Sequence, residues 1–447
     1  MKRIINVLFP VLMVLLLVSC GGSPESGGKN ARFAKIDLYG AVGLVSQKAG
    51  STKGSKAAGP EQQDLYKIDE SDGSEEPVVL MDESGNPVLS WGDPTSVSRL
   101  NDKYFILTFK KQGTYYPPFL LVSTEEDILI CLNHISDYSH SCMELEEMGN
   151  LATTEYVSTT DNEYIYWTPP NMASDNMLNG TKLNRFNKET KQIDTLYRVE
   201  DKQIYALSVG NVTSGTYSGK DVVMMHTTGN TYSNASSEKI IKVLIDGSVE
   251  KTFTNQTSSP NPFVFFINNI FYVVDSGKVW TYSVDGSSLP ESMTSYDVAN
   301  VSSYYRKVVT SGTTGILFGE NSSVFYFVNG TNISRIQCDS TIADIQTDGS
   351  HYYVCLNGTD SSTIKKYSVL DGTEVATFII NDTTEGFRIK SFFSENPNFI
   401  FIGQRNSDSK YVRGELTLGD TVTVTIKSES SEEFNNLTKI DTSTSSL

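Results

Sequence analysis

The sequence predicts an all-β fold built from a repeated unit of about four short strands. Three observations carry this prediction. Polar turns recur roughly every 40 to 65 residues, and short apolar runs fill the intervals between them. No long segment shows the 3.6-residue apolar period of a helix. Aromatic residues make up 11% of the chain, which suits strands that bury alternate side chains.

Eight turns mark the units. Asp-Gly and Asn-Gly pairs tolerate the positive φ angles that tight hairpins need, so their recurrence between apolar runs has a physical cause. The turns are Ser71-Asp72-Gly73, Thr124-Glu125-Glu126, Asn187-Lys188-Glu189, Asp246-Gly247, Asp285-Gly286, Asn329-Gly330, Asp371-Gly372 and Gly419-Asp420.

Two sets of strands align between these turns. The first set is Tyr104–Phe109, Tyr164–Trp167, Val222–Met225, Ile270–Val274, Gly315–Phe318, Tyr352–Leu356 and Phe399–Ile402. A second apolar stretch precedes most of these strands, for example Ile204–Val209, Pro262–Ile267 and Phe387–Phe393. Four-stranded repeats of this length predict a β-propeller, a ring of small sheets.

The eight turns predict eight blades, with Thr421–Lys427 as the last strand of the final unit. The first unit, about 33–90, is irregular, so a ring of seven stays open. Closure of a propeller normally joins strands from both chain ends in one blade. Tandem β-sandwiches are the alternative fold.

The chain resembles the bacterial extracytoplasmic β-propellers. Ile364–Phe378 looks like the outer hairpin of a quinoprotein-like blade, and Leu183–Ile193 is a weaker echo of it. The closing Trp of quinoprotein-like repeats and the Trp-Asp ending of WD40 blades are both missing. The resemblance therefore implies the fold and matches no specific family.

The N-terminus has the order of a secretory signal. Lys2 and Arg3 precede an apolar stretch, which ends in Leu17-Val18-Ser19-Cys20. This ending resembles the bacterial lipobox, which implies that residues 1–19 are removed and that Cys20 carries the lipid. The alternative is a transmembrane anchor, but the stretch is shorter than the roughly 20 residues that span a bilayer.

The lipobox implies a place in the cell envelope. Gly21 and Gly22 follow Cys20 with no Asp at the second position, a pattern that favours the outer membrane in enterobacteria. We expect a lipid-anchored protein there, on the periplasmic face or the cell surface. Residues 20–32 form a flexible tether, 33–427 the propeller and 428–447 a disordered tail.

Four further cysteines suggest disulfides in an oxidising compartment. Cys131 and Cys142 close a short loop, and the open alternatives are two free thiols or a zinc site completed by His134 and His140. Cys338 and Cys355 form a tentative second disulfide. The alternative for that pair is two small buried apolar residues.

Composition and motifs argue against several functions. The net charge of −17 would repel nucleic acid. His226 and His351 have no sequence-visible catalytic partner, and no Gly-x-Ser-x-Gly elbow precedes a helix. The acids gather in solvated turns (Asp69–Glu76, Glu125–Asp127 and Glu144–Glu147). We therefore expect no catalytic residues, no metal site, no cofactor and no enzyme activity.

The sequence instead favours binding. Tyr115-Tyr116-Pro117-Pro118, the segment from Trp167 to Pro170, and Tyr304-Tyr305 are candidates for a protein-binding patch or for packing between blades. We expect a scaffold lipoprotein for protein partners, held to the membrane by its N-terminal lipid. A carbohydrate or small-ligand binder and a propeller hydrolase or lyase are the alternatives.

Overall fold

The computed structural model describes the strands and most of their connections in the C-terminal half, and mainly the strands in the N-terminal half. The described residues are 35–36, 38, 41–48, 63–69, 71–78, 80–81, 94–99, 104–109, 120–123, 129–131, 157–159, 164–167, 182–187, 193–198, 202–229, 240–254, 262–275, 277–286, 288–298, 306–319, 322–359, 361–380, 386–395 and 398–440.

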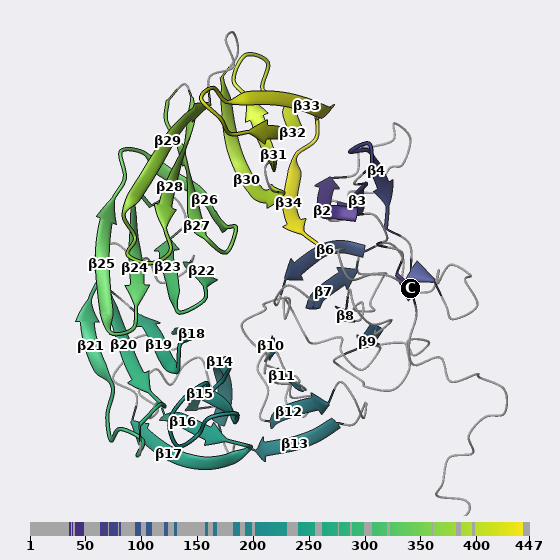
Figure 1. Cartoon of the computed structure of the whole chain (residues 1–447). Coiled ribbons are helices and arrows are strands. Elements are labelled where there is room, and N and C mark those ends of the chain that lie inside the picture. The colour runs from purple at the N-terminus through teal and green to yellow at the C-terminus, as the bar shows by residue number, and fades with distance from the viewer. Residues whose placement is uncertain are drawn as a thin grey trace, which may run out of the picture.

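The chain folds as an all-β propeller. The described residues form eight four-stranded antiparallel sheets and one two-stranded pair, β1 (Lys35–Ile36) with β5 (Leu80–Met81). Seven sheets are simple meanders in which consecutive strands of the chain lie side by side. The sheets stand around a ring, with the first strand of each near the centre and the fourth at the periphery (Figure 1). This order excludes tandem β-sandwiches.

Each meander sheet runs from its inner strand to its outer strand in chain order. The first three are β6 (Pro94–Arg99), β7 (Tyr104–Phe109), β8 (Leu120–Ser123) and β9 (Leu129–Cys131); β10 (Val157–Thr159), β11 (Tyr164–Trp167), β12 (Lys182–Asn187) and β13 (Ile193–Arg198); and β14 (Lys202–Asn211), β15 (Asp221–Gly229), β16 (Ile240–Ile245) and β17 (Ser248–Thr254).

The other four meanders follow along the chain. They are β18 (Phe263–Ile267), β19 (Ile270–Asp275), β20 (Lys278–Ser283) and β21 (Thr294–Asp297); β22 (Arg306–Ser311), β23 (Thr314–Gly319), β24 (Val324–Asn329) and β25 (Asn332–Gln337); β26 (Thr341–Thr347), β27 (His351–Asn357), β28 (Ser362–Ser368) and β29 (Glu374–Ile380); and β30 (Phe387–Glu395), β31 (Asn398–Arg405), β32 (Tyr411–Thr417) and β33 (Thr423–Ser430).

The remaining sheet joins both ends of the described chain. Its order is β34 (Phe434–Lys439), β2 (Ala41–Lys48), β3 (Gln63–Asp69) and β4 (Glu75–Pro77). Strand β34 pairs with β2 and contacts β30 and β6, the inner strands on either side. The first unit is thus completed by a C-terminal strand, which is the usual way in which a propeller is closed.

The expected disordered tail is wrong for residues 428–440. Strand β33 extends to Ser430, and β34 follows within four residues. Phe434 and Leu437 are both buried in the same apolar cluster although they are three residues apart. A register shift in the β2–β34 ladder leaves Asn435 without a partner in β2 and so returns both side chains to one face. A strict period-2 pattern misses such a strand.

Among the described residues, apolar clusters fill the spaces between neighbouring sheets from β10–β13 round to the sheet of β34 and β2. On β27, Tyr352, Val354 and Leu356 pack toward the β22–β25 sheet, whereas Tyr353 and Cys355 pack toward the β30–β33 sheet. Because middle strands bury both faces, they appear in the sequence as continuous apolar runs. The core is therefore a series of layers between blades, which fixes the sheets relative to one another.

The expected second strands and several turns are confirmed. All seven strands of the first expected set coincide with, or lie within, the second strand of a sheet. The Asp246-Gly247 turn has φ values of 47° and 82°, as a tight hairpin requires. The two segments that resemble outer hairpins fall on β28–β29 and β12–β13, the third and fourth strands of their sheets. No helix in the described part of the chain is long and apolar enough to cross a membrane.

Candidate functional site

The β28–β29 hairpin exposes an unusual amount of apolar surface. The large apolar side chains that are exposed in the described residues are Val249, Leu370, Val375 and Ile379. Three of them lie on this one hairpin, with exposed fractions of 79% for Leu370, 55% for Val375 and 56% for Ile379. Several exposed apolar side chains on one element make it a candidate protein-binding site.

The turn of this hairpin holds Leu370 outward. The carboxylate of Asp371 accepts hydrogen bonds from the backbone N–H and the hydroxyl of Thr373, at 3.1 and 2.8 Å. Gly372 has a φ of 71°, and a Cβ atom there would lie 2.6 Å from the Phe327 ring. Glycine alone combines that backbone angle with that close approach to the neighbouring sheet, so this position of the turn requires glycine.

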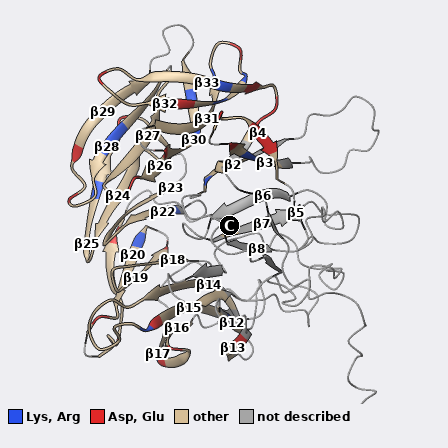
Figure 2. Cartoon of the chain, turned by 45° about the vertical axis from the view of Figure 1, so that its right-hand side comes forward, with Lys and Arg blue, Asp and Glu red and all other residues tan. Residues whose placement is uncertain are grey.

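β29 presents a second apolar face at the periphery. Phe378 packs into the layer between its own sheet and the β30–β33 sheet, so Val375 and Ile379, an odd number of residues away, face the other side. β29 carries a single charged residue, Glu374, and is otherwise tan in Figure 2. β29 ends the sheet order, so no strand of its own sheet pairs with its outer edge.

The one acid of β29 is held within the hairpin. Glu374 accepts a hydrogen bond from the Thr377 hydroxyl at 2.7 Å and pairs with the Lys365 ammonium at 3.3 Å. The same ammonium lies 3.0 Å from Asp339. These bonds to Asp339 and Glu374 raise the pKa of Lys365, and its ammonium is paired with these two carboxylates. The exposed face thus carries two apolar side chains, Val375 and Ile379, with the Thr377 hydroxyl between them.

His351 lies beside an acid but does not form a catalytic dyad with it. Asp348 accepts hydrogen bonds from the backbone N–H groups of Ser350 and His351 and from the Tyr353 hydroxyl, at 2.8, 2.7 and 2.8 Å. Burial opposes ionisation of Asp348, but these bonds outweigh it and lower its pKa. The His351 Nδ1 atom is 3.8 Å from the carboxylate, too far for a hydrogen bond. The acid closes the β26–β27 turn.

His226 is a fully buried core residue. It lies on β15 between the register partners Ala206 and Ile241, with no exposed surface. A side chain that solvent does not reach is poorly placed to serve a substrate. The expectation of a structural histidine is the interpretation that the burial favours.

Asp344 joins two inner strands. It lies on β26 beside a register shift, and its carboxylate accepts hydrogen bonds from the Ser391 hydroxyl and the Phe392 N–H of β30, at 2.9 and 3.1 Å. Burial raises the pKa of Asp344, although Lys307 and these hydrogen bonds act in the opposite direction. The hydrogen bonds of the Asp344 carboxylate are all to protein groups of the same blade or the next one. Asp344 therefore has a structural role, which is to hold β26 against β30.

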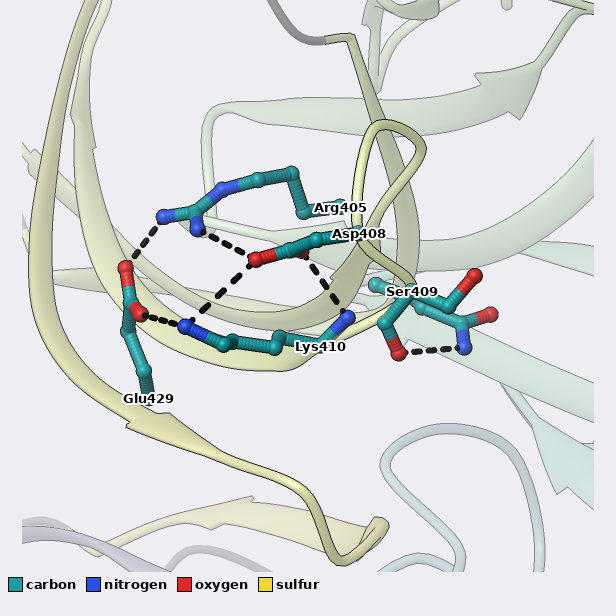
Figure 3. A network of polar contacts seen from close by, with 6 residues as sticks. Arg405, Asp408, Ser409, Lys410 and Glu429 are labelled. Atoms are coloured by element: carbon teal, nitrogen blue, oxygen red, sulfur yellow. Dashed lines mark hydrogen bonds and ion pairs between the residues drawn. The ribbon is translucent and has the colours of Figure 1, made fainter.

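The β31–β32 turn carries a closed network of charges (Figure 3). Arg405 pairs with Asp408 at 3.2 Å and with Glu429, and Lys410 pairs with the same two acids at 3.5 and 3.3 Å. Hydrogen bonds from Arg405 and Lys410 lower the pKa of Glu429. Two cations and two anions neutralise one another here, so the network stiffens the turn and leaves little charge for a ligand.

Several acids of the segment Asp69–Glu76 form hydrogen bonds or ion pairs within the protein. Asp69 and Asp72 accept hydrogen bonds from Ser71 and Ser74 and shape the turn. Glu75 is drawn into an ion pair with the buried Arg413 of β32. Within the described residues, no three or more His, Cys, Asp or Glu side chains gather in a way that could hold a metal ion.

The tentative Cys338–Cys355 disulfide is wrong. Both cysteines are free and buried. Cys338 packs in the layer between the β22–β25 and β26–β29 sheets, whereas Cys355 packs in the layer on the opposite side of the β26–β29 sheet. A sheet therefore separates the two sulfur atoms. The alternative interpretation, two small buried apolar residues, is the one the structure bears out.

Several expected sites lie outside the described residues. These are Cys20 and the segment 1–32, Cys142 with His134 and His140, the side chains of Cys131 and Trp167, and the aromatic motifs at 115–118, 168–170 and 304–305. The β28–β29 hairpin, in contrast, was expected as an element but not as a site. Its alternating residues read as core positions in the sequence, and only the three-dimensional arrangement shows that Val375 and Ile379 are exposed.

Comparisons with known proteins do not assign the chain to a family. No protein-family model matches the chain, and no curated protein matches its sequence. Among solved structures, apo AztD from Citrobacter koseri is similar over 91% of this chain and 96% of its own, with 10% identity and a TM-score of 0.46.

Two other solved structures illustrate the range of these matches. Hsv2 from Kluyveromyces lactis is similar over 75% of this chain and 98% of its own, with 10% identity and a TM-score of 0.38. The Dos1 propeller has 12% identity and a TM-score of 0.36, over 68% of this chain and 75% of its own. At these scores the matches say nothing about activity, and the fold assignment rests on the chain's own strand order.

Proposed function

We propose that this protein is a lipid-anchored, extracytoplasmic β-propeller that binds protein partners at the cell envelope. The observation that carries the proposal is the apolar surface of the β28–β29 hairpin, where Leu370, Val375 and Ile379 are all more than half exposed. An isolated exposed apolar residue is ordinary, but three on one hairpin favour an interaction surface.

The polar groups of the described residues support binding over chemistry. The buried or half-buried acids Asp344 and Asp348 have their oxygens occupied by hydrogen bonds within the protein. Catalysis would need a base or nucleophile within reach of a substrate. The alternatives of a sugar binder, hydrolase or lyase gain no specific support from the described residues.

Three features of the sequence support the anchor. They are the basic start, the apolar stretch and the lipobox-like Leu17-Val18-Ser19-Cys20. An acylated Cys20 would hold the propeller at a membrane through a short tether, and Gly21 favours the outer membrane. We propose the periplasmic face of that membrane or the cell surface as the place where it acts.

Capture from native membranes tests the binding function. The full chain, V375D/I379D and V249D would each be used as bait after mild cross-linking. Val249 is the matched control, because it is an exposed apolar residue on another outer strand. We expect a partner that the parent and V249D recover and V375D/I379D loses. Equal recovery by all three baits, or no partner with any of them, would contradict the proposal.

Fractionation tests the anchor separately. We expect C20S to move from the membrane fraction to the soluble extracytoplasmic fraction, and mass spectrometry of the parent to show an N-terminal acylated Cys20. An intact segment 1–19 or an unmodified Cys20 would exclude lipid anchoring, and it would leave the binding test unaffected.

A further inference from the structure

We propose that the partner which the β28–β29 hairpin fits is a second copy of this chain, paired antiparallel along the outer edge of β29. This inference rests on the proposed binding function and names the partner of the same surface. The pairing would extend two four-stranded sheets into one continuous eight-stranded sheet across a two-fold axis.

The edge of β29 lacks the usual protection against such pairing. Proteins commonly blunt edge strands with charges or proline. Most other described outer strands carry such charges, as in Glu250 and Lys251 on β17, Arg335 on β25, and Lys427 and Glu429 on β33. β29 is free of charge from Val375 to Ile380, the longest such run among the described outer strands.

The sequence of β29 is complementary to itself when reversed. A register centred on Thr377 sets Val375 opposite Ile379 twice, Ala376 opposite Phe378 twice, and Thr377 opposite its own copy. β-Branched pairs and Thr–Thr pairs are favourable across antiparallel strands, and a small residue opposite a large one fits well. A two-fold interface requires this kind of reciprocity, since each contact is made twice.

The exposed side chains lie where the pairing needs them. Val375 and Ile379 are 55% and 56% exposed and share one face with Thr377. In the two-fold register these residues form a small apolar layer of four side chains around the two threonines. Phe378, on the other face, already packs inside its own molecule and so gives the edge a rigid support.

Charge opposes this contact in part, because each chain has a net charge of −17 and the Glu374 carboxylate is hydrogen-bonded to Thr377 at the proposed axis. Glu374 is the only charged residue of β29, and the register places it opposite Ile380 rather than opposite its own copy. It is also paired with Lys365. The register shift in the β28–β29 ladder leaves Val375 without a partner in β28, so the irregular residue falls at the two ends of the new ladder.

The oligomeric state of the soluble chain tests the proposal. The protein would be the full mature chain with Cys20→Ser, analysed by sedimentation across a broad range of concentration. We expect a reversible dimer, and V375K and I379K should each weaken its association about tenfold or more, because a lysine ammonium would be buried against apolar groups. V249K on β17 is the control and should leave the dimer unchanged.

A cysteine scan tests the register. Residues directly opposite one another have Cα atoms about 4.5–5.5 Å apart, within the span of a disulfide. We therefore expect T377C, which lies on the two-fold axis, to form a covalent dimer on mild oxidation. A376C faces Phe378 and should not form one above the background of the parent chain.

The outcomes separate this inference from the proposed function. A monomer at every concentration, a dimer unaffected by I379K, or A376C cross-linking as well as T377C would each overturn the inference. If the chain is monomeric yet the hairpin variants still lose a captured partner, only this inference fails. If the dimer forms by β29 and no other partner is ever captured, the binding surface is real and its partner is the second copy.

Discussion

The guanidinium of Arg413, on β32, forms an ion pair with the carboxylate of Glu75, on β4, at 2.5 Å. The same guanidinium donates a hydrogen bond to the carbonyl oxygen of Gly73, also at 2.5 Å. Arg413 has only 3% of its side chain exposed and Glu75 only 17%. This pair joins the last meander sheet to the sheet that contains the N-terminal strands, across 338 residues of sequence.

Breaking this pair should destabilise the protein strongly. In R413A the Glu75 carboxylate keeps its buried position without a cation, and removing one partner of a buried ion pair typically costs about 3–5 kcal/mol. Urea unfolding would measure the loss. E75Q with R413M, which removes both charges, should recover much of it. A loss in R413A below about 1 kcal/mol would show that the pair is effectively solvated.

The sequence predicted the meander sheets well because their signals are local. The turns at Asp246-Gly247 and Asp371-Gly372 need φ angles that glycine supplies, and both fall between the third and fourth strands of a sheet. The middle strands, such as Tyr352–Leu356, are apolar throughout because each face packs against a different neighbour. Both features can be recognised within a few consecutive residues of the sequence.

The features that the sequence did not predict depend on how the strands are arranged in three dimensions. The tail strand β34 was missed because its apolar residues, Phe434 and Leu437, are spaced by a bulge rather than by alternation. The predicted Cys338–Cys355 disulfide was wrong because side chains alternate between the two faces of a strand. Cys355 therefore lies on the face of its sheet opposite to the layer that contains Cys338. The apolar site at Val375 and Ile379 was missed because their alternation with buried residues is also typical of core positions, and only the folded structure shows that they are exposed.

The C-terminal strand should be needed for stability. Phe434 is buried in the cluster that β34 shares with Val45, Ile68 and Phe393, and a buried Phe→Ala change typically costs about 3–5 kcal/mol. We therefore expect F434A to lower the unfolding free energy by about that amount, and truncation after residue 430 to lower it further. Removal of residues 441–447 alone is the control. A truncation at residue 430 with parental stability would contradict the pairing of β34 with β2.

Asp344 should make stability depend on pH in an unusual direction. Its pKa is raised in the folded state, chiefly by burial, above the ordinary value of about 3.9 for an aspartate. The folded state therefore binds the proton more tightly than the unfolded state does. This group stabilises the fold below its ordinary pKa and loses that contribution as the pH rises through the raised value.

D344N isolates this effect, because asparagine does not titrate. Measured by urea unfolding from pH 7 downward, the stability of the parent relative to D344N should increase as the pH falls toward the ordinary Asp range. D344A should be less stable than the parent by about 1–3 kcal/mol at neutral pH, since the Phe392 N–H and the Ser391 hydroxyl lose their acceptor. A difference between parent and D344N that stays constant with pH would exclude a raised pKa.

Cys338 and Cys355 should be free but almost unreactive in the native protein. Burial raises the pKa of the Cys338 thiol to about 11 and raises that of Cys355 well above its usual value. At pH 8 the reactive thiolate of Cys338 is then present in about one molecule in a thousand. The test uses the mature chain with Cys20, Cys131 and Cys142 changed to serine, so that only these two thiols remain. A thiol-specific colorimetric reagent should react with neither thiol in the native protein and with both in urea without reductant. If the denatured protein shows no thiols until a reductant is added, the two cysteines form a disulfide after all.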